Sequence, residues 1–369
     1  LAKDELDCLY EQAQFQPIIG NLKDEEGQPE WAKPYLVHKT KAGTKIAFLA
    51  YTFPYYLTYA PNGWQVLEPM ARLEEDLARS EVMDADLVIV LSHLGVRYDE
   101  QISETYPQVN LVIGSHTHHL FEEGKLINET YLAAADRYGY FLGCIDLTVE
   151  NGQMIACQIE AIPTKDYILD LDKEDEAFIK AMREEGHRRL AQEKVANLGR
   201  KLNFNETCQL VLQAVCQETD SQLTLLNTGL IMKTLGPQVT MADLQEALPH
   251  QMRMARLFVT GQELKEICRE VFTKAELLKN QAIKGMGFRG KVFGELITGN
   301  FAYKNGNLLY NSRVVDSNEK FSLVLVDQYY FSSYFPTIKE KEVTLLFPDL
   351  FRELVAKYLR NNGADWDKR

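Results

Sequence analysis

The sequence lacks several features that mark particular classes of protein. Its 369 residues contain no apolar run long enough to cross a membrane, and the most apolar stretch, residues 46–60, is interrupted by Pro54. From its opening residues, Leu-Ala-Lys-Asp-Glu, we expect no secretory signal peptide, and the sequence contains no initial Met, internal repeat or low-complexity tract. The six cysteines show no Cys-x-x-Cys spacing, which suits reduced thiols in a cytoplasmic protein better than a disulfide framework or a zinc knuckle.

The sequence also has fewer basic than acidic residues. The 40 Lys and Arg residues are outnumbered by 53 Asp and Glu residues, which gives a formal net charge of −13. A nucleic-acid polymer is therefore excluded as the expected partner, because binding its phosphates requires a basic face. A small phosphorylated substrate is not excluded, since a metal centre neutralises such a charge locally.

The length and the residue pattern predict two domains. Strand–helix–strand alternation followed by hairpins in the first half indicates a sheet sandwich flanked by helices, with one helix predicted over residues 64–82. We expect a first domain over residues 1–165, a highly charged connecting helix within residues 166–197 and a second domain over residues 198–369.

The most informative stretch contains two short apolar runs, residues 86–91 and 109–113, that read as buried strands. The first ends in Ser92-His93-Leu94-Gly95 and the second in Gly114-Ser115-His116-Thr117-His118. Reactive groups collect beyond the carboxyl ends of such strands, and imidazole is a common metal ligand. We therefore expect His93, His116 and His118 to converge on a metal centre; the alternative is that they are ordinary polar loop residues.

These motifs, followed by YGYFLGCIDL, resemble the last third of the metallophosphoesterase domain in the bacterial 5'-nucleotidase / 2',3'-cyclic-nucleotide phosphodiesterase family. The second half, with NTGLI, LPH and TGQEL, resembles that family's substrate-binding domain. The resemblance implies an α/β fold: a partial four-layer αββα sandwich joined by a helix to a smaller α/β domain. It also implies two divalent metal ions of the Mn, Zn, Co or Mg type, with His93, His116 and His118 as metal ligands. It assigns no ligand role to His119.

The family's other metal motifs are Asp-x-His, Gly-Asp and Gly-Asn-His-Glu/Asp, and none of them occurs in this sequence. The last of these also supplies the catalytic acid histidine, which we expect upstream of Leu1. The chain thus resembles an enzyme without the first part of its catalytic domain. A fragment of a longer enzyme is favoured over a truncated relative, because the loss of several strands would expose one flank of the sheet.

The same resemblance suggests substrate-binding residues in the second half. They are Asn227 and Gly229 in the Asn-x-Gly turn and three aromatic residues that could hold a base, Tyr329, Tyr330 and Phe331. Separately from the resemblance, the basic glycine loop over residues 285–291 supplies Arg289, which suits a phosphate or a carboxylate. The alternative for the aromatic residues is a place in the core of a terminal strand.

The expected protein is a cytoplasmic, metal-dependent phosphoester hydrolase that acts on a nucleotide or a related small phosphate ester. We expect neither a nucleic-acid polymer nor a membrane as its partner. The alternative is a non-catalytic relative that binds a nucleotide or another small ligand, in which the sheet domain is a remnant.

Overall fold

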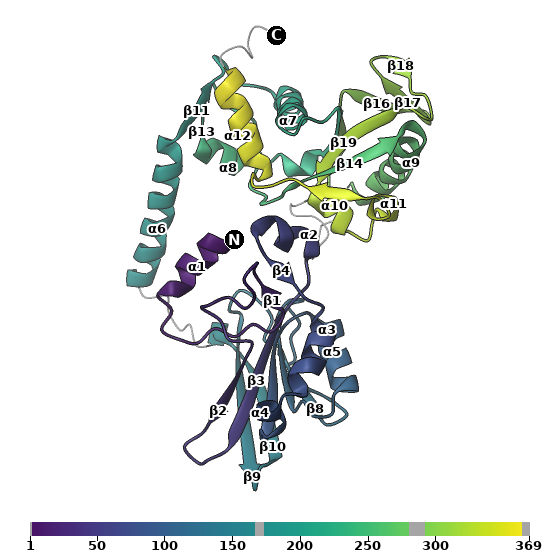
Figure 1. Ribbon diagram of the computed structural model, residues 1–369. Coiled ribbons are helices and arrows are strands. Elements are labelled where there is room, and N and C mark those ends of the chain that lie inside the picture. The colour runs from purple at the N-terminus through teal and green to yellow at the C-terminus, as the bar shows by residue number, and fades with distance from the viewer. Residues whose placement is uncertain (1, 167–172, 280–291, 364–369) are drawn as a thin grey trace. The chain divides into compact units, whose positions relative to one another are not determined.

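A computed structural model describes residues 2–166, 173–279 and 292–363 (Figure 1). The chain divides into two compact units, Leu1–Asp172 and Lys173–Arg369. The predicted charged helix is present as α6 (Lys173–Gln192), and it is grouped with the second unit. Within the described residues, no helix combines the length and apolar character that a membrane span requires.

The first unit is built on a six-stranded sheet. In spatial order its strands are β2 (Tyr35–Lys39), β3 (Lys45–Thr52), β5 (Leu87–His93), β6 (Leu111–Gly114), β8 (Thr130–Ala133) and β7 (Lys125–Ile127). The four central strands are parallel, and an antiparallel strand lies at each edge. The parallel strands therefore all end at the same edge of the sheet.

Alternate residues of these strands face two different apolar layers, as the period of two in a strand requires. Val88 and Val90 face a core completed by α3 (Pro69–Leu77) and α5 (Val96–Thr105), which lie beside the sheet in Figure 1. Ile89 faces a second core, completed by the hairpin of β9 (Phe141–Glu150) and β10 (Gln153–Pro163). Helices, sheet and hairpin form layers of the expected partial sandwich.

The predicted helix over residues 64–82 is wrong in its extent. Gln65–Val66 forms strand β4, paired with β1 (Leu22–Lys23), and α3 starts only at Pro69. Proline fits the first turn of a helix because the backbone N–H that it lacks has no partner there. After α3 the chain is extended at Arg79, and the short helix α4 (Ser80–Met83) follows. The remaining elements of this unit are α1 (Lys3–Glu11), α2 (Tyr56–Tyr59) and the 3₁₀ turns η1 (Ala60–Asn62) and η2 (Thr164–Asp166).

The second unit has a mixed five-stranded sheet. Its order is β15 (Leu296–Gly299), β12 (Leu223–Asn227), β19 (Lys320–Val326), β14 (Met254–Thr260) and β20 (Val343–Leu345). Helix α7 (Phe204–Glu218) packs on β12 and β15, α9 (Gly261–Leu278) packs on β14, and α12 (Phe351–Asn362) packs on α7. This unit is the expected smaller α/β domain.

One helix of the second unit starts at a side-chain cap. The side chain of Thr240 accepts a hydrogen bond from the backbone N–H of Asp243 and so caps α8 (Met241–Ala247). Its remaining elements are β11 (Lys194–Asn197) paired with β13 (Gln238–Thr240), the sheet of β16 (Phe301–Lys304), β17 (Asn307–Tyr310) and β18 (Arg313–Val314), the turn η3 (Thr228–Leu230), and the helices α10 (Asp327–Phe331) and α11 (Pro336–Lys339).

Candidate functional site

The register of two parallel strands brings two of the predicted histidines together. His93 is the last residue of β5, and His116 lies two residues beyond the end of β6. Ser92 is paired with Gly114 across these neighbouring strands, so the two strands end side by side at the same edge of the sheet. The imidazoles of His93 and His116 consequently meet at the carboxyl edge of the sheet, with ring centroids 4.8 Å apart.

The facing nitrogens of this pair have a separation that suits metal binding. Nε2 of His93 lies 3.2 Å from Nδ1 of His116. Two nitrogen ligands bound to one ion at about 2.0–2.1 Å with a tetrahedral angle stand about 3.3 Å apart. The pair therefore fits two adjacent positions around a single divalent ion.

The electrostatics of the pair favour the neutral imidazoles that metals require. Burial, and next the neighbouring His118, lower the pKa of His93 below its usual value. Burial lowers the pKa of His116 as well, with further contributions from His93 and His118. Both rings therefore stay unprotonated to a lower pH than a free histidine.

His116 is held by two aromatic residues that the sequence reasoning missed. The ring of Phe53 stacks on it at 5.0 Å with an interplanar angle of 19°, and the hydroxyl of Tyr55 lies 3.2 Å from its Nε2. Both residues follow β3, whose last residue Thr52 is paired with His93. The sequence feature that could have identified them is their position directly after a third parallel strand, which lies next to the strands that lead to the histidines.

A buried carboxyl group lies next to the ends of β5 and β6, the strands that lead into the loops carrying His93 and His116. Asp99, which is 5% exposed, accepts a hydrogen bond from the hydroxyl of Ser92, and that hydroxyl in turn accepts one from the backbone N–H of Leu94. Burial raises the pKa of Asp99 to about 6, against the opposing effect of the Ser92 hydrogen bond. Asp99 thereby fixes the backbone on both sides of His93.

His118 and His119 lie in the same loop as His116, with different surroundings. His118 has a φ of 54°, and a positive charge on it would oppose protonation of His93 and His116. Nδ1 of His119 is 2.9 Å from the hydroxyl of Thr117. Across the part of the chain that the structure describes, no group of three or more His, Cys, Asp or Glu side chains is placed to hold a metal ion. Two ligands fit, and a third ligand from His118 stays a prediction.

A hollow of about 330 Å³ opens beside this pair of histidines. Thr52, Ser92, His93 and Ser115 line its polar part, and the rest is lined by residues 18 and 19 together with further residues of β3, β5 and β6. The site is thus an open edge of the sheet with imidazole and hydroxyl groups at its rim.

In the second unit, two of the predicted substrate residues are interior. Tyr329 is completely buried, and its hydroxyl donates a hydrogen bond of 2.8 Å to Oδ1 of Asn227. The amide of Asn227 in turn donates to the carbonyl of Phe293 at 2.6 Å. These bonds join β12 to α10 and give both side chains a role in the core; contact with a substrate stays a prediction.

The other predicted substrate residues differ in their exposure. Gly229 lies against the backbone of Val292 and Phe293 so closely that a side chain would not fit. Tyr330 and Phe331 meet edge to face at 5.3 Å, and Phe331 is 40% exposed. Arg289 lies outside the described residues.

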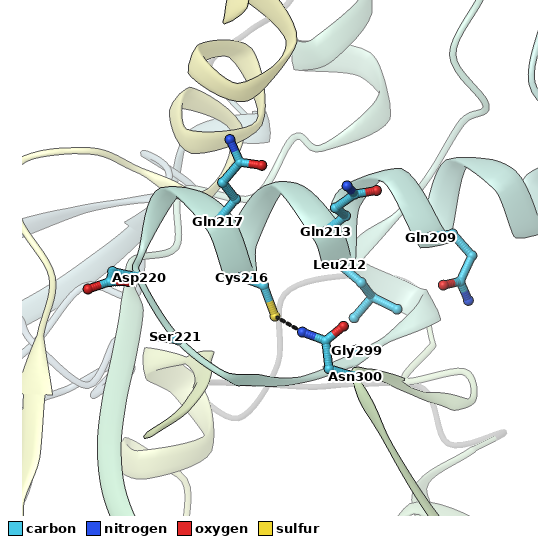
Figure 2. A pocket seen from close by; sticks show the side chains of 9 residues that line it. All are labelled: Gln209, Leu212, Gln213, Cys216, Gln217, Asp220, Ser221, Gly299 and Asn300. Atoms are coloured by element: carbon cyan, nitrogen blue, oxygen red, sulfur yellow. Dashed lines mark hydrogen bonds between the residues drawn. The ribbon is translucent and has the colours of Figure 1, made fainter. Parts of the chain in front are cut away.

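A separate hollow of about 520 Å³ lies along α7 in the second unit (Figure 2). Figure 2 shows Cys216 and Asn300 pointing toward each other, and the Asn300 amide is 3.6 Å from the sulfur. Burial raises the pKa of the Cys216 thiol, so it remains protonated. Amide side chains are the commonest type among its described lining residues, which include no Lys, Arg or His.

Known proteins are similar to this chain in sequence and in fold. No protein-family model matches the chain. The chain is 30% identical over 376 residues to the uncharacterized metallophosphoesterase YunD of Bacillus subtilis. This alignment covers 96% of this chain and 80% of YunD. Among solved structures, a Staphylococcus aureus protein assigned as a 5'-nucleotidase, in complex with α-ketoglutarate, matches with a TM-score of 0.67 at 13% identity, covering 98% of this chain and 78% of the other. The NAD nucleotidase of Haemophilus influenzae matches with a TM-score of 0.60 at 14% identity, covering 98% and 79%.

Proposed function

Since the chain belongs to the metallophosphoesterase family with the two-domain 5'-nucleotidase architecture, we propose that it is a metal-dependent hydrolase of nucleotides or related small phosphate esters. The observation that carries the proposal is the separation of 3.2 Å between Nε2 of His93 and Nδ1 of His116. These nitrogens would hold a divalent ion, with His118 as a further ligand. In this family the expected centre contains two such ions.

When bound, divalent ions of this kind lower the pKa of a water molecule and neutralise charge on a phosphoryl group. The contribution of this chain's own residues is positional. Phe53 and Tyr55 fix the plane of the His116 ring, and the buried Asp99 fixes the loop that carries His93. Remaining ligands are not assigned to residues of the printed sequence, because the acidic and asparagine motifs of the family are absent from it.

The second unit would bind the organic part of the substrate through the exposed Phe331 and the adjacent Tyr330. We extend the proposal to a cytoplasmic location, which the six free cysteines favour because a reducing compartment keeps thiols unpaired.

The alternative function is a non-catalytic protein that binds a nucleotide or another small ligand. The observation in its favour is the lack of a complete set of three metal ligands among the described residues. Hydrolysis and mere binding are distinguished by product release from the same ligand.

The test combines metal binding with hydrolysis of bis(p-nitrophenyl) phosphate and of nucleoside monophosphates in the presence of Mn²⁺. Wild-type protein is expected to bind Mn²⁺ and release product, and both His93→Ala and His116→Ala are expected to abolish both properties. His38→Ala is the matched control, because His38 is exposed on β2 of the same sheet. Wild-type protein that binds a nucleotide without releasing product would favour the binding protein, and metal binding unchanged in both histidine variants would refute the metal site.

A further inference from the structure

The hydrogen bonds around Ser115 have a fixed direction. Its Oγ lies 3.2 Å from the carbonyl oxygen of Ser92 and 2.8 Å from Nδ1 of His93. A carbonyl oxygen only accepts, so the single hydroxyl proton of Ser115 is donated to Ser92. The hydroxyl oxygen must then accept from His93, which places the hydrogen of the neutral ring on Nδ1.

We propose that Ser115 is a positioning residue that holds His93 in the Nδ1–H tautomer, so that the lone pair of Nε2 is presented to a divalent metal ion. The inference rests on the proposed function in one respect, the assignment of Nε2 as a ligand. Neighbours of a ligating histidine commonly select its tautomer and orient its ring in this way. Here the selecting group is a hydroxyl from the adjacent histidine loop.

The surroundings of His116 agree with this assignment. With the His93 hydrogen on Nδ1, Nε2 of His93 accepts a hydrogen bond from Nδ1 of His116 across 3.2 Å. Nε2 of His116 then accepts from the Tyr55 hydroxyl. To bind an ion through Nδ1, His116 must instead carry its hydrogen on Nε2. The Tyr55 hydroxyl is compatible with both tautomers of His116, because it can either donate to Nε2 or accept from it. His93 needs no such change.

A second hydroxyl in the same loop supplies a control. Oγ1 of Thr117 accepts a hydrogen bond of 3.0 Å from the backbone N–H of Val96, which follows His93 by three residues. Thr117 therefore also joins the two histidine loops, but it makes no bond to the His93 ring in the structure. Loss of the Thr117 hydroxyl weakens the connection between the loops and leaves the group that selects the tautomer in place.

The direct test is the nitrogen NMR spectrum of the full-length protein labelled with ¹⁵N-histidine, in EDTA at pH 8, with His93 assigned by comparison with His93→Gln. Wild-type His93 is expected to show the Nδ1–H pattern. Ser115→Ala is expected to shift it toward a mixture of tautomers, and Thr117→Ala is expected to leave it unchanged. An Nε2–H pattern in the wild-type protein would overturn the proposal without any variant, as would identical His93 signals in the wild type and Ser115→Ala.

The second readout is Mn²⁺ affinity by calorimetry. Ser115→Ala is expected to lower it about 10- to 100-fold, the usual effect of losing a group that orients a ligand, and Thr117→Ala is expected to have a smaller effect. Equal affinities in the wild type and Ser115→Ala would contradict the proposal. Because the spectrum is recorded without metal or substrate, an Nδ1–H His93 in a protein without phosphatase activity would refute the hydrolase and leave the tautomer assignment standing.

Discussion

Gly114 lies directly against the buried carboxylate of Asp99. A Cβ at position 114 would approach Oδ2 of Asp99 more closely than real Cβ atoms approach any neighbour. Gly114 is also the last residue of β6, and it is paired with Ser92, which itself donates a hydrogen bond to Asp99. The two strands that carry the histidines therefore converge on one buried carboxyl group.

Gly114→Ala is expected to destabilise the first unit by about 1–3 kcal/mol, the usual effect of overpacking a closed interior. Urea denaturation measures the change. Gly143→Ala in β9 is the matched control, because its Cβ would meet Ala135 at an ordinary 3.5 Å, and it is expected to change stability by less than about 0.5 kcal/mol. Equal stabilities of the two variants would contradict the close approach.

Asp99 should make the stability of the fold depend on pH. Its pKa is raised from 3.8 to about 6, chiefly by burial, so the folded state holds the proton more tightly than the unfolded state. Below about pH 3 both states are protonated and the effect is absent. As the pH rises from about 3 to about 7, the unfolded chain ionises before the folded chain does, so stability falls by about 3 kcal/mol in total and then levels off.

Asp99→Asn isolates this contribution, because asparagine keeps an acceptor for the Ser92 hydroxyl and cannot ionise. Denaturation free energies of the variant and the wild type are compared between pH 4 and pH 7. The wild type is expected to lose stability relative to the variant as the pH rises through this interval. Parallel curves would mean that Asp99 titrates at its ordinary pKa.

Tyr55→Phe removes the hydroxyl that faces Nε2 of His116 at 3.2 Å. Burial raises the pKa of Tyr55, so the wild-type hydroxyl stays protonated at working pH. We expect Mn²⁺ affinity to fall about tenfold, because the His116 ring loses the partner of its second nitrogen. The control is Tyr56→Phe, since Tyr56 is 54% exposed. Equal Mn²⁺ affinities of the two variants, measured by calorimetric titration, would exclude this role for Tyr55.

Tyr329→Phe removes the donor that satisfies the buried Oδ1 of Asn227. An unsatisfied buried acceptor costs about 1–3 kcal/mol, and the variant should be destabilised by that amount. Thermal or urea unfolding of this variant is compared with that of Tyr330→Phe, which changes the neighbouring, partly exposed tyrosine. A greater loss in Tyr330→Phe would indicate that the Asn227 bond contributes little.

The strands that carry the histidines could be predicted from the sequence because the evidence is local. Each is a short apolar run that ends in Gly or Ser, and His93 and His116 follow from the parallel arrangement. Phe53 and Tyr55 could not be assigned in this way, because their role depends on the register of β3 with β5. The burial of Asp99 was also not predicted, since a carboxylate in the first turn of a helix usually faces solvent.

In the second unit, a short motif alone does not indicate how exposed its residues are. Asn227 and Tyr329 stand where the resemblance predicts substrate contacts, yet a bond between positions 102 residues apart places both in the interior. The exposure of a side chain depends on the packing of the whole unit, and a short motif does not contain that information. The helix predicted over residues 64–82 is wrong in its extent because β4 is formed by pairing with the distant β1.

The pairing of Ser92 with Gly114 also determines which changes of chain length the site can tolerate. Inserting one residue within β5 would turn His93 to the opposite face of the sheet, because strand side chains alternate with a period of two. An insertion in the connection between α5 and β6 would leave both strand ends where they are. Homologous chains that keep this pair of histidines should therefore vary in length within that connection and keep the lengths of β5 and β6 constant.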